Sequence, residues 1–204
     1  MRLYYHLSLP YLTNTYLIGP ASGGPALVID PGAMDIQLLQ LIENNNYYVK
    51  SILVTNPDKA HTRGISTILR IYDAVVYSGQ RQTDDYPSSC VIDGQTLLLH
   101  DFQVQVFSAQ GLSREALMFK IENCLFSGDA ISAGKAGDVP SVFSKAILIS
   151  RLKELFTTLP PNTIIFPASG PPTTLTLETH FNSDLQQTEK NTEEDSELID
   201  TILD

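Results

Sequence analysis

One histidine and one carboxylate in the loop after a β-like run are the residues most able to do chemistry. The apolar run 51–54 ends at Thr55, and the polar stretch that follows carries Asp58 and His61 before a helix-like segment. Imidazole and carboxylate side chains in such a loop are typical ligands of a hydrolytic metal centre. A catalytic zinc ion usually needs three firm protein ligands and keeps a further position for water. Ligands from other segments would therefore have to complete a site in this loop.

Short β-like and helix-like segments alternate along the chain and would position that loop. Apolar runs predict strands at 2–9, 14–19, 25–30, 49–55, 74–79 and within 162–175, with two more in each of 90–109 and 116–129. Apolar residues at helical spacing predict helices over 34–46, 61–73, 141–159 and 176–187. Two sheets packed together with helices outside them would bury every apolar face.

Composition and charge narrow the class of protein. Apolar residues make up 43% of the 204 residues, and the formal net charge is −10. A nucleic-acid-binding surface needs a basic patch, so we expect no nucleic-acid partner. No apolar run reaches the roughly 20 residues that span a bilayer, so we expect no membrane partner. The N-terminal stretch lacks the apolar core of a signal peptide, and Cys90 and Cys124 lack metal-binding spacing, which favours a cytoplasmic protein with free thiols.

The C-terminal end differs in composition from the rest of the chain. Residues 187–204 contain seven acidic residues and one lysine. We interpret residues 1–186 as a single domain and residues 187–204 as an acidic C-terminal tail. The sequence does not predict an oligomeric state.

Four segments resemble the metallo-β-lactamase fold superfamily, and most closely its small glyoxalase-II-like hydrolases. They read TNTYLIG…ALVIDPGA, ILVTNPDKAHTRGI, LFSGDAISAGKAGD and IIFPASGPPTTL. The last two are the more specific, because several positions match in order. The resemblance implies an α/β (α+β) fold, a four-layer αββα sandwich of two mixed β-sheets flanked by helices. It also implies a site for two metal ions at the ends of the sheets.

The resemblance implies seven metal-ligand positions, and most of them carry another residue type here. Those positions are Asn56, Asp58, Ala60, His61, Leu112, Asp129 and Ser169. Leu112 and Ala60 have no ligating atom, and amide or hydroxyl oxygens are poor partners for zinc. Only His61 and Asp129 keep the family's residue type. We therefore expect a degenerate site without a dinuclear zinc centre, in a pseudoenzyme that acts as a binding or regulatory module without a cofactor.

Two alternatives remain open from the sequence. Asp58, His61 and Asp129 together would form a site for one divalent metal, which would make the protein a hydrolase of thioester or phosphoester substrates. The other alternative is a scaffolding subunit that makes contact through its acidic tail.

Four cations lie in the loops that would surround the site. They are Lys59, Arg63, Arg114 and Lys135, from a chain with only 13 lysines and arginines. Cationic side chains in place of metal ions would hold a carboxylate or phosphate group by charge-assisted hydrogen bonds. The expected partner is therefore a small anionic ligand or another protein.

Overall fold

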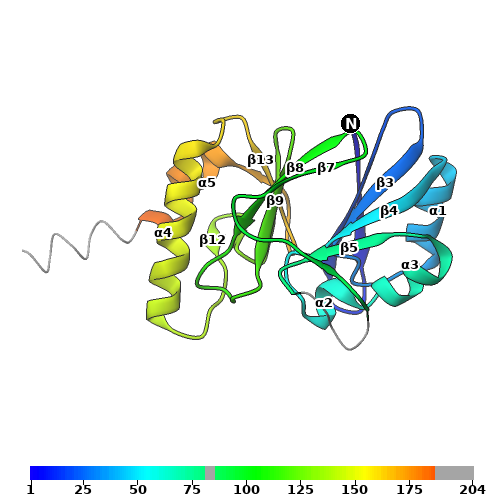
Figure 1. The fold of residues 1–204 in the computed structure, drawn as a ribbon. Helices are drawn as coiled ribbons and strands as arrows, with labels where there is room; N and C mark the ends of the chain where they lie inside the picture. The colour runs from blue at the N-terminus through cyan, green and yellow to red at the C-terminus, as the bar shows by residue number, and fades with distance from the viewer. Residues whose placement is uncertain (81–85, 187–204) are drawn as a thin grey trace, which may run out of the picture.

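The computed structural model describes residues 1–80 and 86–186, which form four layers in the order helices, sheet, sheet, helices (Figure 1). The predicted αββα sandwich of two mixed sheets is confirmed. The proposed acidic tail at 187–204 lies outside the described residues, and the boundary at residue 186 stays a prediction.

The first sheet combines an antiparallel edge with a parallel half. Its strand order is β1-β2-β3-β4-β5-β6, with β1 antiparallel to β2, β2 antiparallel to β3, and the later pairs parallel. The strands are β1 Arg2–Ser8, β2 Thr13–Gly19, β3 Gly24–Ile29, β4 Tyr47–Leu53, β5 Val75–Ser78 and β6 Ser89–Cys90. Helices α1 (Ile36–Asn44) and α3 (Ile65–Ile71) cover its outer face (Figure 1). These parallel crossovers bring the loops after β3 and β4 to the same sheet edge.

The second sheet is mostly antiparallel. Its strand order is β14-β13-β10-β9-β8-β7, and the only parallel pair among these strands is β10 with β13. The strands are β7 Thr96–Leu99, β8 Phe102–Ser108, β9 Leu117–Ile121, β10 Cys124–Gly128, β13 Ile164–Pro167 and β14 Thr173–Thr174. Helices α4 (Val142–Thr158) and α5 (Leu175–Phe181) lie outside it, and a small hairpin pairs β11 (Ile131–Ser132) with β12 (Lys135–Ala136).

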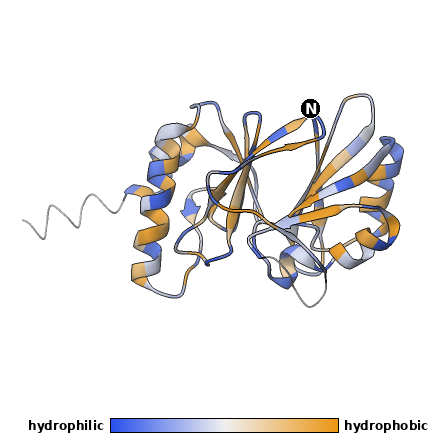
Figure 2. Ribbon diagram, in the orientation of Figure 1, coloured by the Kyte–Doolittle hydropathy of each residue, from blue (hydrophilic) through white to orange (hydrophobic). Residues whose placement is uncertain are grey.

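Apolar side chains fill three layers between these elements. The middle layer lies between the sheets and contains Tyr16, Leu27, Phe119 and Phe126, all nearly inaccessible to solvent. One outer layer packs against α1 and α3, and the other packs against α4, whose apolar stripe is visible in Figure 2. Burial of one such large side chain contributes about 1.5–3 kcal/mol. The three layers therefore hold the two sheets in a fixed relation to one another.

The predicted helix over residues 61–73 is wrong in detail, because two short helices occupy this region. They are α2 (Lys59–Thr62) and α3, and Gly64 separates them as the residue before α3. The Gly64 N–H donates to the Pro31 carbonyl oxygen at 2.7 Å. A Cβ at this position would lie 2.6 Å from that oxygen, so only glycine permits the approach. This contact turns the chain and lets α2 take its own direction.

The β7–β8 hairpin confirms the prediction of two strands around a turn within residues 90–109, but the start of that range belongs to the other sheet. Cys90 belongs to β6 in the first sheet, whereas the chain from Thr96 onward forms the β7–β8 hairpin of the second. A turn around Gly94, with a positive φ of 79°, lies between them. The apolar pattern does not reveal this change of sheet, because both sheets bury the same kind of residue.

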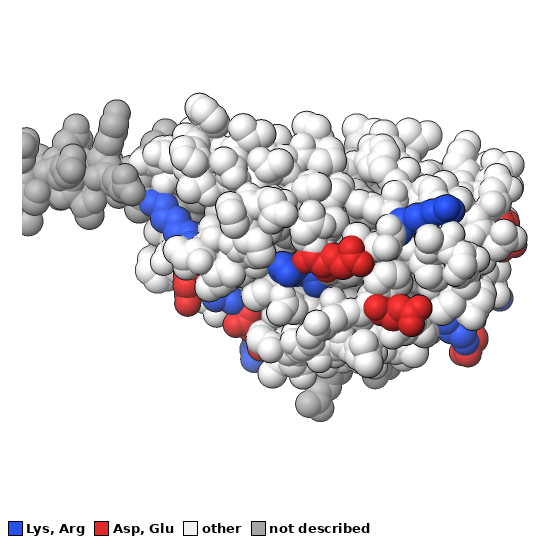
Figure 3. All heavy atoms as spheres, turned by 90° about the horizontal axis from the view of Figure 1, so that it is seen from above, with Lys and Arg blue, Asp and Glu red and all other residues white. Residues whose placement is uncertain are grey.

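Several composition-based expectations can be compared with the described residues. No helix among them is long and apolar enough to cross a membrane. Cys90 and Cys124 are free thiols, and Cys124 is buried. The face seen in Figure 3 carries scattered cationic and acidic side chains without an extended basic patch. The absence of a nucleic-acid partner and the cytoplasmic location stay predictions.

Candidate metal centre

The candidate site lies where loops from both sheets meet. The loop after β4 supplies Asn56, Asp58 and His61, and Asp129 follows β10 directly. Gly128 takes a positive φ of 56° and packs against Thr55, where a Cβ would lie 2.4 Å from the threonine hydroxyl oxygen. This close approach brings Asp129 beside the loop after β4.

Asp58 serves as the N-cap of α2. Its Oδ1 accepts hydrogen bonds from the backbone N–H of Ala60 at 2.8 Å and of His61 at 3.3 Å. An N-cap of this kind contributes about 1 kcal/mol to local stability. The cap fixes the direction of α2 and therefore of the His61 side chain.

His61 lies buried between two carboxylates. Its Nε2 is 2.9 Å from Asp129 Oδ2, and its Nδ1 is 3.2 Å from Asp30 Oδ2. Asp30 also accepts from the backbone N–H of Thr55 at 2.8 Å and from its hydroxyl at 2.6 Å. His61 and Asp30 are each only 2% exposed. Sequence analysis did not identify Asp30, and its only signal was a polar residue ending the apolar run 25–30.

The two carboxylates determine the charge of the imidazole ring. Burial lowers the pKa of His61, but the charge of Asp30 and hydrogen bonds to Asp129 and Asp30 outweigh burial and raise this pKa from 6.5 to about 11. Burial raises the pKa of Asp129, but the hydrogen bonds from His61 and Asn56 and the charge of His61 lower it overall. At neutral pH the cluster is therefore an imidazolium ion between two carboxylates.

The same cluster contains ligand atoms for a metal ion, but hydrogen bonds already use some of them. Asp58, His61 and Asp129 each present one ligand atom, and the three atoms lie within 4.8 Å of one another. The Asn56 Nδ2 lies 3.0 Å from Asp58 Oδ2 and 3.2 Å from Asp129 Oδ2. Side-chain N–H groups thus reach Asp58 Oδ2 and Asp129 Oδ2, and a metal ion at either oxygen would have to displace them. Two carboxylates and one imidazole are too few ligands for two zinc ions.

A pocket of about 490 Å³ opens beside this cluster. It brings together Asn56, Leu112, Asp129 and Ser169, four of the positions that the family resemblance assigned to metal ligands. Ala60 is not among the lining residues. Four of the predicted positions therefore do converge in space, although three of them carry no charge and one of these three is apolar.

The four candidate cations do not share this pocket. Lys135 lines it, but its ammonium group lies 3.0 Å from Asp138, which lines it as well. Lys59, Arg63 and Arg114 are exposed and are not among the residues that line the pocket. The charged side chains of the lining are thus Asp129, Asp138 and Lys135.

The C-terminal helices hold the far wall of the pocket. Glu178, which is 2% exposed, accepts from the Gly134 N–H at 3.0 and 3.1 Å. The Lys145 ammonium donates to the carbonyl oxygens of Ala136 at 2.9 Å and Gly137 at 3.1 Å. It also lies 2.9 Å from Asp184, whose carboxylate accepts from the Ala136 N–H. This network fixes the β11–β12 hairpin and the residues after it.

Comparison with solved structures decides the fold. The chain matches the crystal structure of BLEG-1 B3 metallo-β-lactamase with a TM-score of 0.79, over 91% of this chain and 100% of that one, at 21% sequence identity. The chain has the metallo-β-lactamase fold. The fold also matches TTHA1623 in a di-iron-bound form, with a TM-score of 0.74 and 25% identity over 88% of this chain and 98% of that one.

Sequence relatives of this metallo-β-lactamase-fold chain include hydroxyacylglutathione hydrolases. The Haemophilus ducreyi enzyme of that name is 26% identical over 167 residues, 79% of this chain and 68% of the relative. An uncharacterized protein of Treponema pallidum is 27% identical over 179 residues, 86% of this chain and 95% of the relative. The match to the hydroxyacylglutathione hydrolase of Citrobacter koseri covers 52% of that relative's length. No protein-family model matches the chain. The predicted resemblance to glyoxalase-II-like hydrolases is thus confirmed by the sequence similarity to hydroxyacylglutathione hydrolases.

Proposed function

We propose that this protein is a degenerate metallo-β-lactamase-fold binding module, without a dinuclear zinc centre and without hydrolase activity. The observation that carries the proposal is the hydrogen bonding of the cluster. His61 and Asn56 direct N–H groups at Asp129, and Asn56 reaches Asp58 as well. Carboxylates that already have such donors keep their charge without a metal ion.

Residue types at the remaining positions support the same conclusion. Leu112 and Ala60 cannot bind a metal, and Asn56 and Ser169 present only neutral oxygens. A zinc ion makes a nucleophile by lowering the pKa of bound water to about 7, and this requires a site with firm ligands. TTHA1623 has a di-iron-bound form, and the similar Haemophilus ducreyi protein is a hydroxyacylglutathione hydrolase. This chain keeps the fold of such proteins, and we propose that it lacks a dinuclear metal centre.

The pocket beside the cluster is the proposed binding surface. Among the described residues that line it, Lys135 is the one cation, so a small anionic ligand would replace Asp138 as the partner of this ammonium group. A protein partner that inserts an acidic side chain would use the same contact. Ser113, Ser132 and Ser169 offer hydroxyl groups along the same wall.

The metal content of the purified protein tests the proposal. The protein is prepared without chelators and without metal-affinity chromatography, and zinc, iron and manganese are measured by elemental analysis. We expect well below one metal ion per chain. Two metal ions per chain would overturn the proposal.

A restored variant serves as the positive control for that measurement. It combines Asn56→His, Asp58→His, Ala60→Asp, Leu112→His and Ser169→His and should bind two zinc ions. Ser169→His alone should not bind two zinc ions, because Asp58, His61, Asp129 and the new histidine are too few ligands for two zinc sites. Stoichiometric zinc and thioester hydrolysis in the single variant would show that the site is one residue away from an enzyme.

A hydrolase with one metal ion is the second candidate, and the spacing of three ligand atoms within 4.8 Å favours it. Asp58, His61 and Asp129 would hold the ion, and their oxygen-rich set suits manganese or magnesium better than zinc. Titration of the protein with Mn²⁺ in a calorimeter, with Asp129→Asn as the control, tests this candidate. Binding of one ion per chain together with thioester or phosphoester turnover would establish it. A scaffolding role through the acidic tail is a third proposal, and it concerns residues beyond those described.

A further inference from the structure

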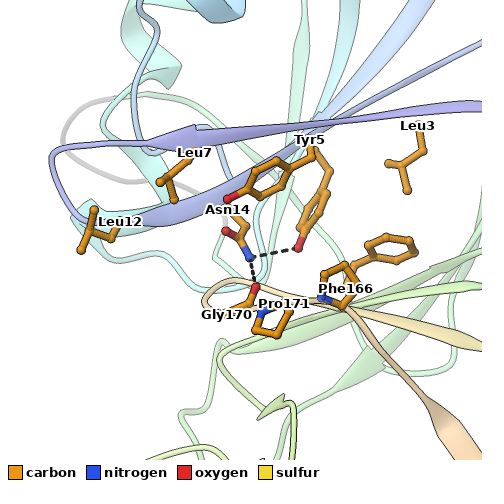
Figure 4. Close-up of a pocket in the computed structure, with 10 residues that line it drawn as sticks. Leu3, Tyr5, Leu7, Leu12, Asn14, Phe166, Gly170 and Pro171 are labelled. Carbon is orange, nitrogen blue, oxygen red and sulfur yellow. Dashed lines mark hydrogen bonds between the residues drawn. The ribbon is translucent and has the colours of Figure 1, made fainter.

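A second pocket, of about 560 Å³, opens at the edge of the sandwich, and its lining includes Gly170, the residue after Ser169 (Figure 4). We call it the edge groove. It lies between the inner face of β1 and the segment that follows β13. Its walls are mainly apolar and aromatic, formed by Leu3, Tyr5, Leu7, Tyr16, Phe166 and Pro171. It shares no lining residue with the pocket beside the Asp–His–Asp cluster.

The strand arrangement explains why the edge groove exists. Side chains alternate between the two faces of a strand, so Leu3, Tyr5 and Leu7 of β1 lie on one face. β1 is the edge strand of the first sheet, and the opposite sheet ends there in the two-residue strand β14. The inner face of β1 therefore remains partly uncovered, and Tyr5 is 56% exposed.

Aromatic rings make the floor of the edge groove rigid. The Tyr16 and Phe166 rings meet edge to face at 5.5 Å, and Phe166 stacks on Phe126 at 5.4 Å. The Tyr16 hydroxyl donates to the Pro167 carbonyl oxygen at 2.6 Å, which fixes that ring. A rigid aromatic floor is a surface on which a flat apolar ligand can stack.

Asn14 places one unpaired acceptor in this apolar surrounding. Asn14 is 2% exposed. The Asn14 Nδ2 donates hydrogen bonds to the carbonyl oxygens of Pro167 at 2.9 Å and Gly170 at 2.8 Å. These two acceptors fix which end of the amide is nitrogen. Among the described residues no donor reaches Asn14 Oδ1, and Figure 4 shows it pointing away from Gly170 on the side of Leu12. Oδ1 is not among the buried side-chain atoms that lack a partner, so solvent reaches it, and an accessible acceptor in an apolar groove favours a ligand that donates a hydrogen bond.

We propose that the edge groove binds a small neutral molecule with a flat apolar body and one hydrogen-bond donor, of the phenol class. Its volume lies within the range of about 300–1,000 Å³ that is usual for small-molecule sites. No charged side chain is among the residues that line it, so a carboxylate or ammonium ligand would lose hydration without gaining a counter-charge. The site is independent of the function proposed above.

Three matched probes test the ligand class by titration calorimetry and protein NMR. They are 4-phenylphenol, its methyl ether 4-methoxybiphenyl, and biphenyl-4-carboxylate. We expect saturable binding of the phenol at one site, about tenfold weaker binding of the ether, and no measurable binding of the carboxylate. The amide signals that shift should belong to residues 3–7 and 166–172. Equal affinity for phenol and ether, or tighter binding of the carboxylate, would overturn the proposal.

Four variants test the location. Leu7→Trp should fill the groove and abolish phenol binding, whereas Leu98→Trp, on a 79% exposed residue of β7, should leave it unchanged. Tyr5→Ser removes a wall at an exposed position and should weaken binding, and Tyr48→Ser, on a 46% exposed residue, is its control. Phenol binding that survives both Leu7→Trp and Tyr5→Ser would overturn the proposal. A wild-type dimer that Leu7→Trp dissociates would overturn it as well, because a second copy would then cover the groove.

Discussion

Replacement of His61 by leucine should destabilise the protein strongly, because it leaves the buried Asp30 carboxylate and the half-buried Asp129 carboxylate without their counter-ion. The imidazole contacts Asp30 at 3.2 Å and Asp129 at 2.9 Å. After the substitution Asp30 keeps its two hydrogen bonds from Thr55 but loses the cation. Leucine has a similar volume, so the effect comes from charge more than from a cavity.

The structure sets the size of this effect. Removal of one partner of a buried ion pair costs about 3–5 kcal/mol. A pKa unit corresponds to about 1.36 kcal/mol, so the rise for His61 from 6.5 to about 11 gives a ceiling of about 6 kcal/mol. For a domain of this length each kcal/mol lowers the Tm by roughly 2–4 °C. We therefore expect His61→Leu to lower the Tm by roughly 6–20 °C.

Urea unfolding of four proteins measures the interaction directly. They are the wild type, His61→Leu, Asp30→Asn and the double variant. We expect the free energy of unfolding to fall less in the double variant than the sum of the falls in the two single variants. The difference should be at least about 1 kcal/mol, because the two residues are in contact. The control is His180→Leu, an exposed helix position where the change should stay within about 0.5 kcal/mol.

Two results would refute this reasoning. A loss below about 1 kcal/mol for His61→Leu, or strict additivity with Asp30→Asn, would show that the imidazolium does not neutralise the buried carboxylates. A fall in wild-type Tm on addition of EDTA, as large as that caused by His61→Leu, would show that a metal ion performs this role.

The other predictions concern pH, the pocket wall and one glycine. Because the folded pKa of His61, about 11, exceeds the unfolded value of 6.5, its stabilisation is complete below pH 6.5 and disappears as the pH rises through about 11. The wild-type urea midpoint should therefore fall more steeply than that of His61→Leu between pH 6.5 and 10, and parallel curves would contradict this. Lys145→Met should cost about 1–3 kcal/mol and speed amide hydrogen exchange at residues 135–138, and unchanged exchange there would contradict the anchoring role. Gly128→Ala should lose at least about 2 kcal/mol in urea unfolding, since its φ is +56° and the new Cβ would meet Thr55 at 2.4 Å; a neutral result would disprove this crowding.

The sequence by itself determined the layers of the fold, and it shows which of the expected ligand positions carry no ligating atom. Apolar periodicity is a local property, so strands such as 14–19 and the long helix near 141–159 could be predicted from neighbouring residues alone. The absence of a ligating atom in Leu112 and Ala60 is a matter of covalent chemistry and needs no coordinates. The candidate positions around Asp129 could be predicted because motifs in several loops follow one another along the chain in the order typical of one superfamily.

Only the tertiary structure decided what surrounds those residues. Asp30 meets His61 because β3 and β4 pair in parallel and bring their following loops together, a contact between residues far apart in sequence. The split between α2 and α3 depends on Gly64 packing against Pro31, which no local pattern encodes. Whether Lys135 or Arg63 lines a pocket depends on the path of separate loops. The edge groove exists because one sheet ends before the other, and strand order across a sheet is a non-local property.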